Sequence, residues 1–397
     1  MSGAFLSYLC YIVEIIIFNY IFYKRFSSAV NPMSALSIPF TLIVFICLFF
    51  NESLGFVSFY YEAIWIWTIG LFLFFIGGIL VDIMCGSLTL NKYYNKYRST
   101  YIFNIIIFIC VCIASVKFKT AISYNDFGSK EMGAEIGMGG IVGRVSNVLL
   151  IAFPYYVVQN IKLWIKTPLV IALLIFIFAL GSKTWIMYSI LAAFMTYILH
   201  KGNYRINYKV LLAVLFAMLL SFVLYYKFKV SIGDSDRFIV FVARHFYFYI
   251  TSGALPLSEY VRLGMDSMHN GITLPFISII FYWMGEAVSA HSPLWIVTDN
   301  VLGTSSNVYT FFGTLWILGD RLDYVFYSIL SGIISMSAYR IYKFHNSIFS
   351  LIAYAYTLCI LFFGWYNWYF ATLRIWEIYA YCFILSKVIN LRIDKIL

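Results

Sequence analysis

The chain has 397 residues, of which 63% are hydrophobic and only 11% are charged. A soluble globular protein carries roughly 25% charged residues, so this composition excludes an ordinary water-soluble domain and indicates a polytopic membrane protein. The formal net charge of +10 could suggest nucleic-acid binding. In a membrane protein, however, an excess of Lys and Arg is typical of cytoplasmic loops. We therefore expect the lipid bilayer, and no nucleic acid, as a partner.

A membrane-spanning helix needs about 20 mainly apolar residues. This rule predicts an all-α polytopic membrane protein, a single domain over residues 1–397, with eleven spans. The N-terminal apolar segment has no basic region before it and no small-residue cleavage site after it, so we expect a retained helix. The predicted spans are residues 4–22, 33–50, 63–82, 101–117, 139–158, 167–181, 184–200, 210–226, 324–340, 347–363 and 374–390.

Residues 227–323 form the long interval in which the apolar runs break up and charges, glycines and histidines collect. Two apolar pieces inside it, residues 272–290 and 305–318, are each a possible span. If both crossed the membrane, the segment between them would be cytoplasmic, yet it contains no Lys or Arg and carries Asp299. We therefore favour re-entrant or membrane-lying helices, which occur at membrane depth where protein buries them.

Basic residues of the short loops predict the orientation of the chain. Lys and Arg gather in every second connection, which marks those connections as cytoplasmic. The N-terminus and the 227–323 loop are then outside, and the C-terminus is inside.

The seven cysteines lie within or at the ends of apolar runs, without CxxC or Cys/His spacing. Buried free thiols are expected, with neither a disulfide framework nor a metal site. His269 and His291 match no zinc pattern either. The sequence thus predicts no metal and no cofactor.

Five cations fall on the expected outer side, at or near membrane depth. Charge at this depth costs several kcal/mol unless a partner or a watery cavity compensates it. A shared phosphate or diphosphate would compensate, and it suits the planar donors of Arg. Snorkelling, or local pairing with aspartates, is the alternative interpretation. The five cations are Arg144, Lys183, Arg237, Arg244 and Arg321.

Arg244 and His245 are the most reactive-looking pair in the loop. Histidine titrates near neutral pH and can accept the proton of a hydroxyl, while a neighbouring arginine can hold a leaving phosphate. Glu259 or an aspartate is the rival base. We assign Arg244, His245 and Glu259 as catalytic candidates.

Asn307, Tyr309 and Thr310 stand together in the segment Asn-Val-Tyr-Thr, directly before two phenylalanines. An amide, a phenol and a hydroxyl can bond sugar hydroxyls while aromatic rings stack on sugar faces. The alternative is a helix cap at Ser305 or Ser306 followed by ordinary packing.

This layout of many spans, one long external loop in the second half, and a few closing spans resembles the Wzy-type O-antigen polymerases, also called oligosaccharide repeat unit polymerases. Lys183 stands where the family commonly has arginine, and the family's Asp-Phe-Gly after the Asn-Val-Tyr-Thr element appears here only as Leu318-Gly319-Asp320. Four local matches carry the resemblance: residues 181–184 (Gly-Ser-Lys-Thr), residues 249–253 (Tyr-Ile-Thr-Ser-Gly) with Ser258-Glu259-Tyr260, residues 307–310, and Gly332.

The resemblance implies a GT-C type membrane glycosyltransferase of polysaccharide and lipopolysaccharide biosynthesis in the bacterial inner membrane, with a periplasmic N-terminus. It would join undecaprenyl-diphosphate-linked oligosaccharide repeat units on the periplasmic side and release undecaprenyl diphosphate. In this interpretation Arg144, Lys183, Arg237, Asn307, Tyr309, Thr310 and Arg321 bind substrate. A chain-length regulator and a flippase are the implied protein partners. An O-antigen ligase, or a polysaccharide flippase or transporter, is the alternative.

Overall fold

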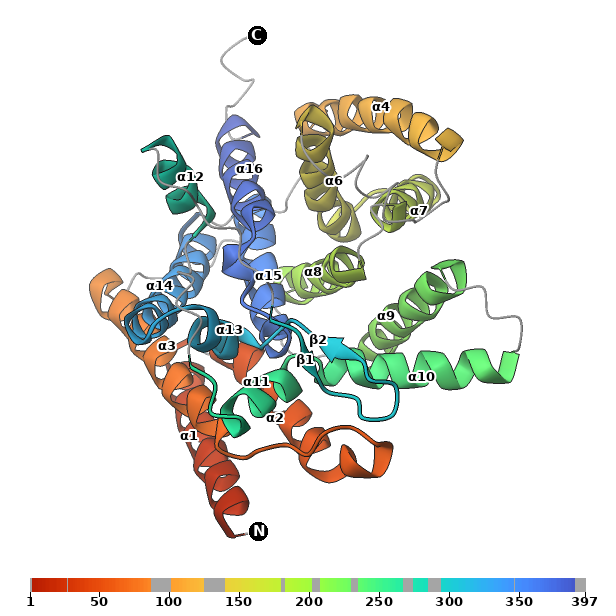
Figure 1. Ribbon diagram of the computed structural model, residues 1–397. Coiled ribbons are helices and arrows are strands. Elements are labelled where there is room, and N and C mark those ends of the chain that lie inside the picture. The colour runs from red at the N-terminus through yellow and green to blue at the C-terminus, as the bar shows by residue number, and fades with distance from the viewer. Residues whose placement is uncertain are drawn as a thin grey trace. The chain divides into compact units, whose positions relative to one another are not determined.

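The computed structural model describes most of the chain, and the described part is mainly helical (Figure 1). The described residues are 2–26, 28–86, 101–124, 140–179, 183–201, 208–229, 235–266, 274–284, 294–345 and 347–389.

Each of the eleven segments predicted as a span contains a helix. Five stretches within them are long and apolar enough to cross a membrane: Phe5–Arg25, Pro32–Phe50, Ala63–Cys85, Ile102–Ala121 and Ile348–Trp365. The helices are α1 (Ser2–Phe26), α2 (Pro32–Phe50), α3 (Ala63–Cys85), α4 (Tyr101–Tyr124), α6 (Gly140–Val158), α7 (Leu163–Ala179), α8 (Lys183–Lys201), α9 (Tyr208–Lys229), α14 (Arg321–His345), α15 (Ile348–Phe362) and α16 (Leu373–Ile389).

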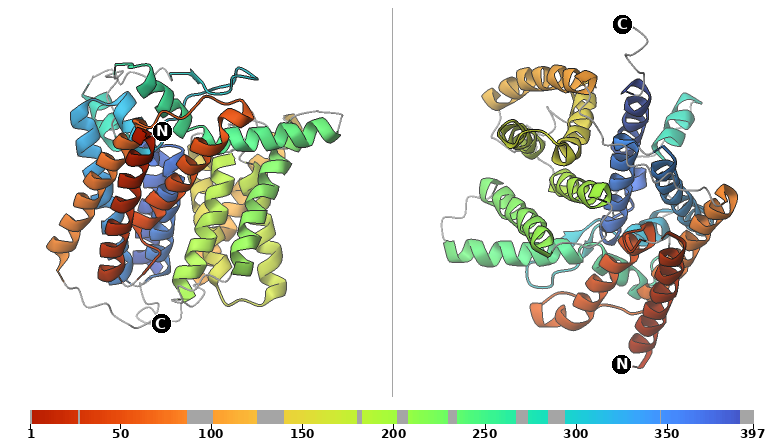
Figure 2. Two further views of the ribbon diagram at one scale, coloured as in Figure 1. Left: turned by 90° about the horizontal axis from the view of Figure 1, so that it is seen from below. Right: turned by 180° about the vertical axis from the view of Figure 1, so that it is seen from behind.

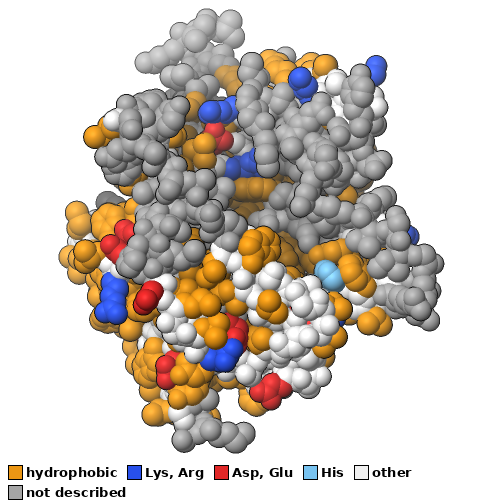
Figure 3. Space-filling model, viewed as in Figure 1, with side chains coloured by type: hydrophobic (Ala, Val, Ile, Leu, Met, Phe, Trp, Pro, Cys, Tyr) orange, Lys and Arg blue, Asp and Glu red, His pale blue; other side chains and the backbone are white. Residues whose placement is uncertain are grey.

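Many large apolar side chains lie exposed on the outside of the helices. On α1, Leu9, Val13, Ile16 and Tyr20 recur every three or four residues and are all exposed. Hydrophobic side chains also make up a large share of the described surface in Figure 3. An apolar face of this extent suits lipid rather than water. The chain is therefore a helical protein of membrane-spanning type.

Between α9 and α14, the described residues contain four helices and a two-stranded antiparallel sheet. The helices are α10 (Ser235–Thr251), α11 (Ala254–Arg262), α12 (Pro275–Trp283) and α13 (Phe311–Leu318). The strands, which the sequence pattern did not predict, are β1 (Ile296–Val297) and β2 (Ser305–Ser306). The axes of α10 and α11 differ by 61° across the two residues that separate them, Ser252 and Gly253.

The two apolar pieces of this interval form short helices. The helix α12 has nine residues and α13 has eight. At 1.5 Å per residue each covers about 12–14 Å, less than half of the roughly 30 Å hydrocarbon core. Residues 272–273 and 285–290 of the first piece lie outside the described residues, so the expectation of re-entrant or membrane-lying helices stays a prediction.

The chain divides into two compact units. Unit 1 comprises Met1–Leu88, Ala243–Ser337 and Ile360–Leu373, and unit 2 comprises Thr89–Val242, Ala338–Cys359 and Arg374–Leu397. The expectation of one membrane domain with an inserted loop stays a prediction. In unit 1, α1, α2 and α3 lie side by side, with α11 and the β1–β2 hairpin gathered at one end of them (Figure 2).

Glycines allow α3 and α14 to approach closely in unit 1. A Cβ added to Gly77 would collide with the backbone carbonyl of Ile329, and one added to Gly332 would collide with that of Phe74. Small residues at helix contacts let backbones pack closely where lipid supplies no hydrophobic driving force between helices. Gly332, one of the positions that carries the family resemblance, thus has a packing role.

In unit 2, α6 packs between α4, α7 and α8. The hydroxyl of Tyr356 on α15 donates a hydrogen bond of 2.9 Å to the carbonyl oxygen of Leu150 on α6. Both residues are fully buried. The bond satisfies a phenol that would otherwise be costly in the interior, and it joins the last part of the chain to α6.

We expect Gly77→Ala to lower the thermal stability of the purified protein, because its new methyl group meets a backbone atom that cannot rotate away. Overpacking of this kind costs about 1–3 kcal/mol. Gly78→Ala is the matched control, since its methyl group meets Cζ of Phe22 at 3.0 Å and Cε of Met336 at 3.7 Å, both at side-chain ends. Equal melting temperatures for the two variants would contradict the glycine contact between α3 and α14.

Candidate functional site

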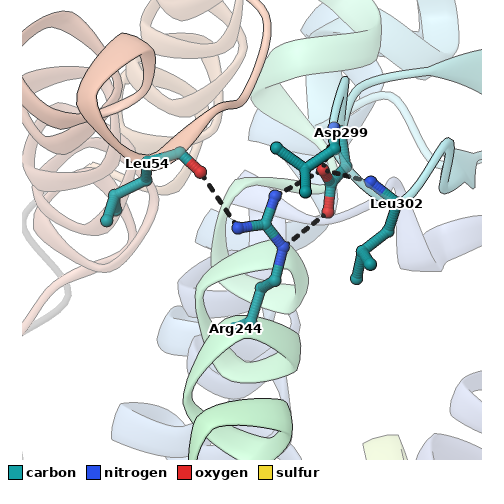
Figure 4. Close-up of polar contacts among 5 residues, drawn as sticks. Leu54, Arg244, Asp299 and Leu302 are labelled. Carbon is teal, nitrogen blue, oxygen red and sulfur yellow. Dashed lines mark hydrogen bonds and ion pairs between the residues drawn. The ribbon is translucent and has the colours of Figure 1, made fainter.

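A bidentate ion pair joins α10 to the β1–β2 hairpin in unit 1 (Figure 4). Nε of Arg244 donates to Oδ2 of Asp299 at 3.0 Å, and Nη2 donates to Oδ1 at 2.5 Å. The third nitrogen, Nη1, donates to the carbonyl oxygen of Leu54 at 3.1 Å. One arginine therefore holds together a helix, a hairpin and the loop after α2.

We call this arrangement of Arg244, Asp299 and Leu54 the Arg244 clamp. Aromatic and amide contacts extend it. The guanidinium carbon of Arg244 lies 4.9 Å from the ring centroid of Phe56, whose ring packs against Tyr247 one turn further along α10. The hydroxyl of Tyr247 donates to Oδ1 of Asn51 at 2.6 Å, and Nδ2 of Asn51 donates to the carbonyl of Val57 at 3.2 Å. The first part of the loop after α2 is thus tied to α10 at Asn51, Leu54 and Phe56.

The carboxylate of Asp299 is almost fully buried, and its charge is compensated. Burial alone raises the pKa of this carboxyl, but the bonds from Arg244 and from the amides of Leu302 and Val301 outweigh burial. The pKa of Asp299 is therefore lower than its ordinary value. The two amides donate to Oδ1 at 3.1 Å and 2.9 Å, which also fixes the turn after Asp299.

The other two catalytic candidates lie on neighbouring helices of unit 1. His245 is half-buried and follows Arg244 on α10. Glu259 is buried on α11 and receives bonds from Nε and Nη2 of Arg262 at 3.0 Å and 2.6 Å. Glu259 already has a cationic partner. A role as base for either residue stays a prediction.

Thr310 is the centre of a second, buried network in unit 1. Its Oγ1 accepts from Nε1 of Trp67 at 2.9 Å and from the amide of Gly313 at 3.1 Å, so it caps α13. Its own amide donates to the carbonyl of Tyr366 at 3.1 Å. The alternative of a cap at Ser305 or Ser306 was wrong in position, because those residues form β2.

The backbone of Thr310 is strained. Its φ of 70° is the one positive value among the non-glycine residues that the structure describes. A β-branched residue adopts this conformation only where its surroundings over-determine it, at a cost of about 1–3 kcal/mol. The three hydrogen bonds of Thr310 supply that constraint.

Tyr309 and Asn307 differ in their exposure. Tyr309 is 2% exposed and its hydroxyl donates to the carbonyl of Leu294. Burial raises the pKa of Tyr309 to about 12. Asn307 is half-buried between β2 and Tyr309. Of the three residues predicted to bind sugar, Tyr309 and Thr310 are buried and hydrogen-bonded within the protein, and only the side chain of Asn307 is partly accessible.

A polar cluster lies in unit 2 near the starts of α6 and α16. Nη1 of Arg144 is 2.9 Å from Oε1 of Glu377, and Nδ2 of Asn147 donates to Oε2 of Glu377 at 2.5 Å. The Arg144 side chain is 64% exposed, whereas that of Glu377 is 17% exposed. The pair therefore presents a guanidinium that is accessible and yet held in place.

Arg374 completes this group, which we call the Arg144 cluster: Arg144, Asn147, Glu377, Arg374 and Trp185. Arg374 lies one turn before Glu377 on α16, and its guanidinium carbon lies 4.9 Å from the Trp185 ring of α8. Residues near the starts of three helices, α6, α8 and α16, thus contribute to one cluster. Arg374 and Glu377 were not predicted as site residues, although their Arg-x-x-Glu spacing at the start of an apolar run is present in the sequence.

The remaining predicted cations fall elsewhere. Lys183 begins α8 and Arg237 lies in the first turn of α10, but their side chains lie outside the described residues, as do His269 and His291. Arg321 is exposed at the start of α14. Asp320 caps that helix, since the amide of Asp323 donates to Asp320 Oδ1 at 2.6 Å. A meeting of all five cations around one anion stays a prediction.

No group of His, Cys, Asp and Glu that could hold a metal ion occurs within the part of the chain that the structure describes. The expectation of a metal-free, cofactor-free protein stays a prediction.

We expect Asp299→Asn to lower the free energy of unfolding by on the order of 3 kcal/mol at neutral pH, because Arg244 loses its charged partner in a largely buried site. The lowered pKa means that the ion pair contributes fully above about pH 3.8 and is lost as the pH falls through the folded-state value. The stability difference between wild type and variant should therefore shrink below that pH. Asn300→Ala, at the exposed neighbour, is the control in detergent unfolding experiments. A difference that persists in acid would contradict the ion-pair assignment.

We expect Thr310→Val to destabilise the protein by about 2–4 kcal/mol, because Trp67 Nε1 and the Gly313 amide lose a buried acceptor. Thr310→Ser keeps the hydroxyl and should lie much closer to wild type in thermal unfolding. Equal losses in both variants would show that the methyl group, and not the hydroxyl, matters.

Comparison with known proteins places the chain in a family. No curated protein and no solved structure matches it. The profile of a family described as "Family of unknown function (DUF6337)" matches residues 55–393, which is more than half of the chain and includes Arg244, Asp299 and the Arg144 cluster. The chain belongs to the DUF6337 family.

Proposed function

We propose that this protein is a polysaccharide polymerase of the GT-C glycosyltransferase class, which joins lipid-diphosphate-linked oligosaccharide repeat units at the outer face of a bacterial inner membrane. The proposal combines the resemblance to Wzy-type polymerases with the local chemistry of unit 2. The observation that carries it is Arg144, an accessible guanidinium fixed by a carboxylate at the expected outer end of α6.

The Arg144 cluster has the properties that a diphosphate site needs. An arginine held by Glu377 loses little side-chain freedom when an anion binds, and its planar donors match phosphate oxygens. Arg374 adds a second positive charge one turn away from Glu377. Hydrogen-bond donors that are already in place where negative charge develops account for a large part of the rate enhancement in reactions of this kind.

The proposed reaction is a transfer of glycan between lipid carriers. A hydroxyl oxygen of the acceptor's terminal sugar attacks the anomeric carbon of the donor glycan. The bond from that carbon to the diphosphate oxygen breaks, and lipid diphosphate leaves. The hydroxyl proton passes to a general base. The Arg144 cluster would stabilise the negative charge on the leaving diphosphate.

The Arg244 clamp has a different part in this proposal. Its guanidinium is taken up by Asp299 and by the carbonyl of Leu54. We therefore assign Arg244 to holding the hairpin and the loop after α2 in place, and Asn307, which is half-buried, to contact with glycan.

Deletion of the gene in its native host, with surface polysaccharide resolved on a gel, tests the function. A polymerase predicts collapse of the ladder to a single repeat unit, restored by the wild-type gene. Complete loss of the polysaccharide would point to a ligase or flippase, and an unchanged ladder would contradict a role in glycan assembly.

In the complemented strain we expect Arg144→Ala to reduce polymerisation by on the order of 10²-fold, which is the effect of removing one fixed charge-stabilising donor. Lys119→Ala removes an exposed cation from α4, on the same expected side, and should leave the ladder unchanged. Membrane abundance of each variant is measured in parallel. Full activity of Arg144→Ala would refute the diphosphate site.

A further inference from the structure

An apolar cavity in unit 2 is lined by side chains of α4, α6 and α7, three helices that are grouped together in Figure 1. Its volume is about 230 Å³, and nine of its ten lining side chains are apolar, Ser115 being the tenth. Such a cavity does not attract water, because water there finds too few polar partners. If the cavity were empty, the side chains that line it would lose dispersion contacts, so an apolar occupant is favoured.

The cavity has a buried floor and an open mouth. Ala114 of α4, Leu149 of α6 and Leu173 of α7 are at most 3% exposed. Ala172 and Ile175, which also line it, are exposed on α7. The opening is therefore on the side of the helices, where the membrane predicts lipid rather than water.

The size of the cavity fits a piece of a lipid tail. A cavity of about 150 Å³ accommodates benzene, with its six carbons, so by proportion this one takes about nine carbons. Nine carbons correspond to about two isoprene units, or to part of an acyl chain. The cavity thus suits the end or a bend of a long hydrocarbon tail rather than a complete small molecule.

The position of the cavity relates it to the Arg144 cluster. Helices α6 and α7 are joined by only four residues, so they run antiparallel, and the start of α6 lies at the same end as the close of α7. Ile175 and Phe176 lie within the last five residues of α7, and Leu149 lies five residues after Arg144. Five residues of helix are about 7–8 Å. A cationic site and an apolar cavity therefore lie at successive depths of one unit.

We infer that the α4–α6–α7 cavity binds the polyprenyl tail of the lipid carrier whose diphosphate is bound by the Arg144 cluster. This inference rests on the proposed function, which requires a polyprenyl diphosphate at that cluster. The combination of an exposed arginine above and an apolar cavity below matches an anionic lipid with a long tail, and the open side lets the rest of the tail remain in the bilayer.

Photolabelling with a diazirine-tagged geranylgeranyl diphosphate tests the site on the purified full-length protein. We expect label on peptides of residues 101–124 and 163–179. Ala172→Trp should fill the mouth and reduce this label on the order of tenfold, whereas Ile171→Trp, at the adjacent exposed position outside the lining, should leave it unchanged. Both positions are exposed on α7, so neither substitution disturbs a packed core.

Two outcomes would overturn the inference. One is label of wild-type strength on these peptides in Ala172→Trp, or label confined to other helices. The other is equal labelling by diazirine-tagged phosphatidylglycerol that excess geranylgeranyl diphosphate does not displace, which would make the cavity a general lipid site.

The polysaccharide gel separates this result from the polymerase proposal. If the ladder of the deletion strain is unchanged but the photolabel behaves as expected, the cavity is a prenyl-lipid site and the polymerase proposal fails. If the ladder collapses to one repeat while Ala172→Trp polymerises and labels like wild type, the polymerase proposal stands and the tail site is refuted.

Discussion

The bidentate pair of Arg244 and Asp299 is the interaction on which the non-spanning part of unit 1 depends. The β1–β2 sheet has two residues in each strand, far too few to be stable alone. It is held because Asp299 binds the guanidinium and two turn amides together, and because the amide of Val57 donates to the carbonyl of Thr298 at 3.0 Å. Removing either charge would leave the other buried without compensation.

The paired arginines of the two units, Arg244 and Arg144, differ in how exposed their side chains are. In unit 1 the arginine is enclosed by its partners, with 23% of its side chain exposed, and its geometry favours a structural task. In unit 2 Arg144 contacts Glu377 through one nitrogen, and its side chain remains 64% exposed. An arginine with a carboxylate partner can therefore be enclosed or accessible, and only an accessible guanidinium has donors left that can reach a ligand.

Regular helices were predictable from the sequence, while the interval 227–323 was not. Apolar runs near 20 residues predicted all eleven helical segments, because lipid requires each backbone group to be satisfied within its own helix. The cap at Thr310 and the cluster of Arg144, Glu377 and Arg374 depend on residues far apart in the chain, such as Trp67 with Thr310. Local patterns contain no information on such pairs. The catalytic prediction rested on the reactivity of side-chain types alone, for Arg244, His245 and Glu259. In the structure, Arg244 and Glu259 have salt-bridge partners.

The Asn-Val-Tyr-Thr segment illustrates how a family motif and a structural motif can coincide. Thr310 and Tyr309 are buried, and Gly253 of the neighbouring motif segment is so close to the carbonyl of Trp365 that a Cβ would collide with it. These residues bring the segments around α11 and α13 together with the loop before α16. If the resemblance to polymerases reflects shared descent, part of what it preserves is this packing. Within this segment Asn307 is the half-buried member, so it is the one whose side chain the packing leaves partly accessible.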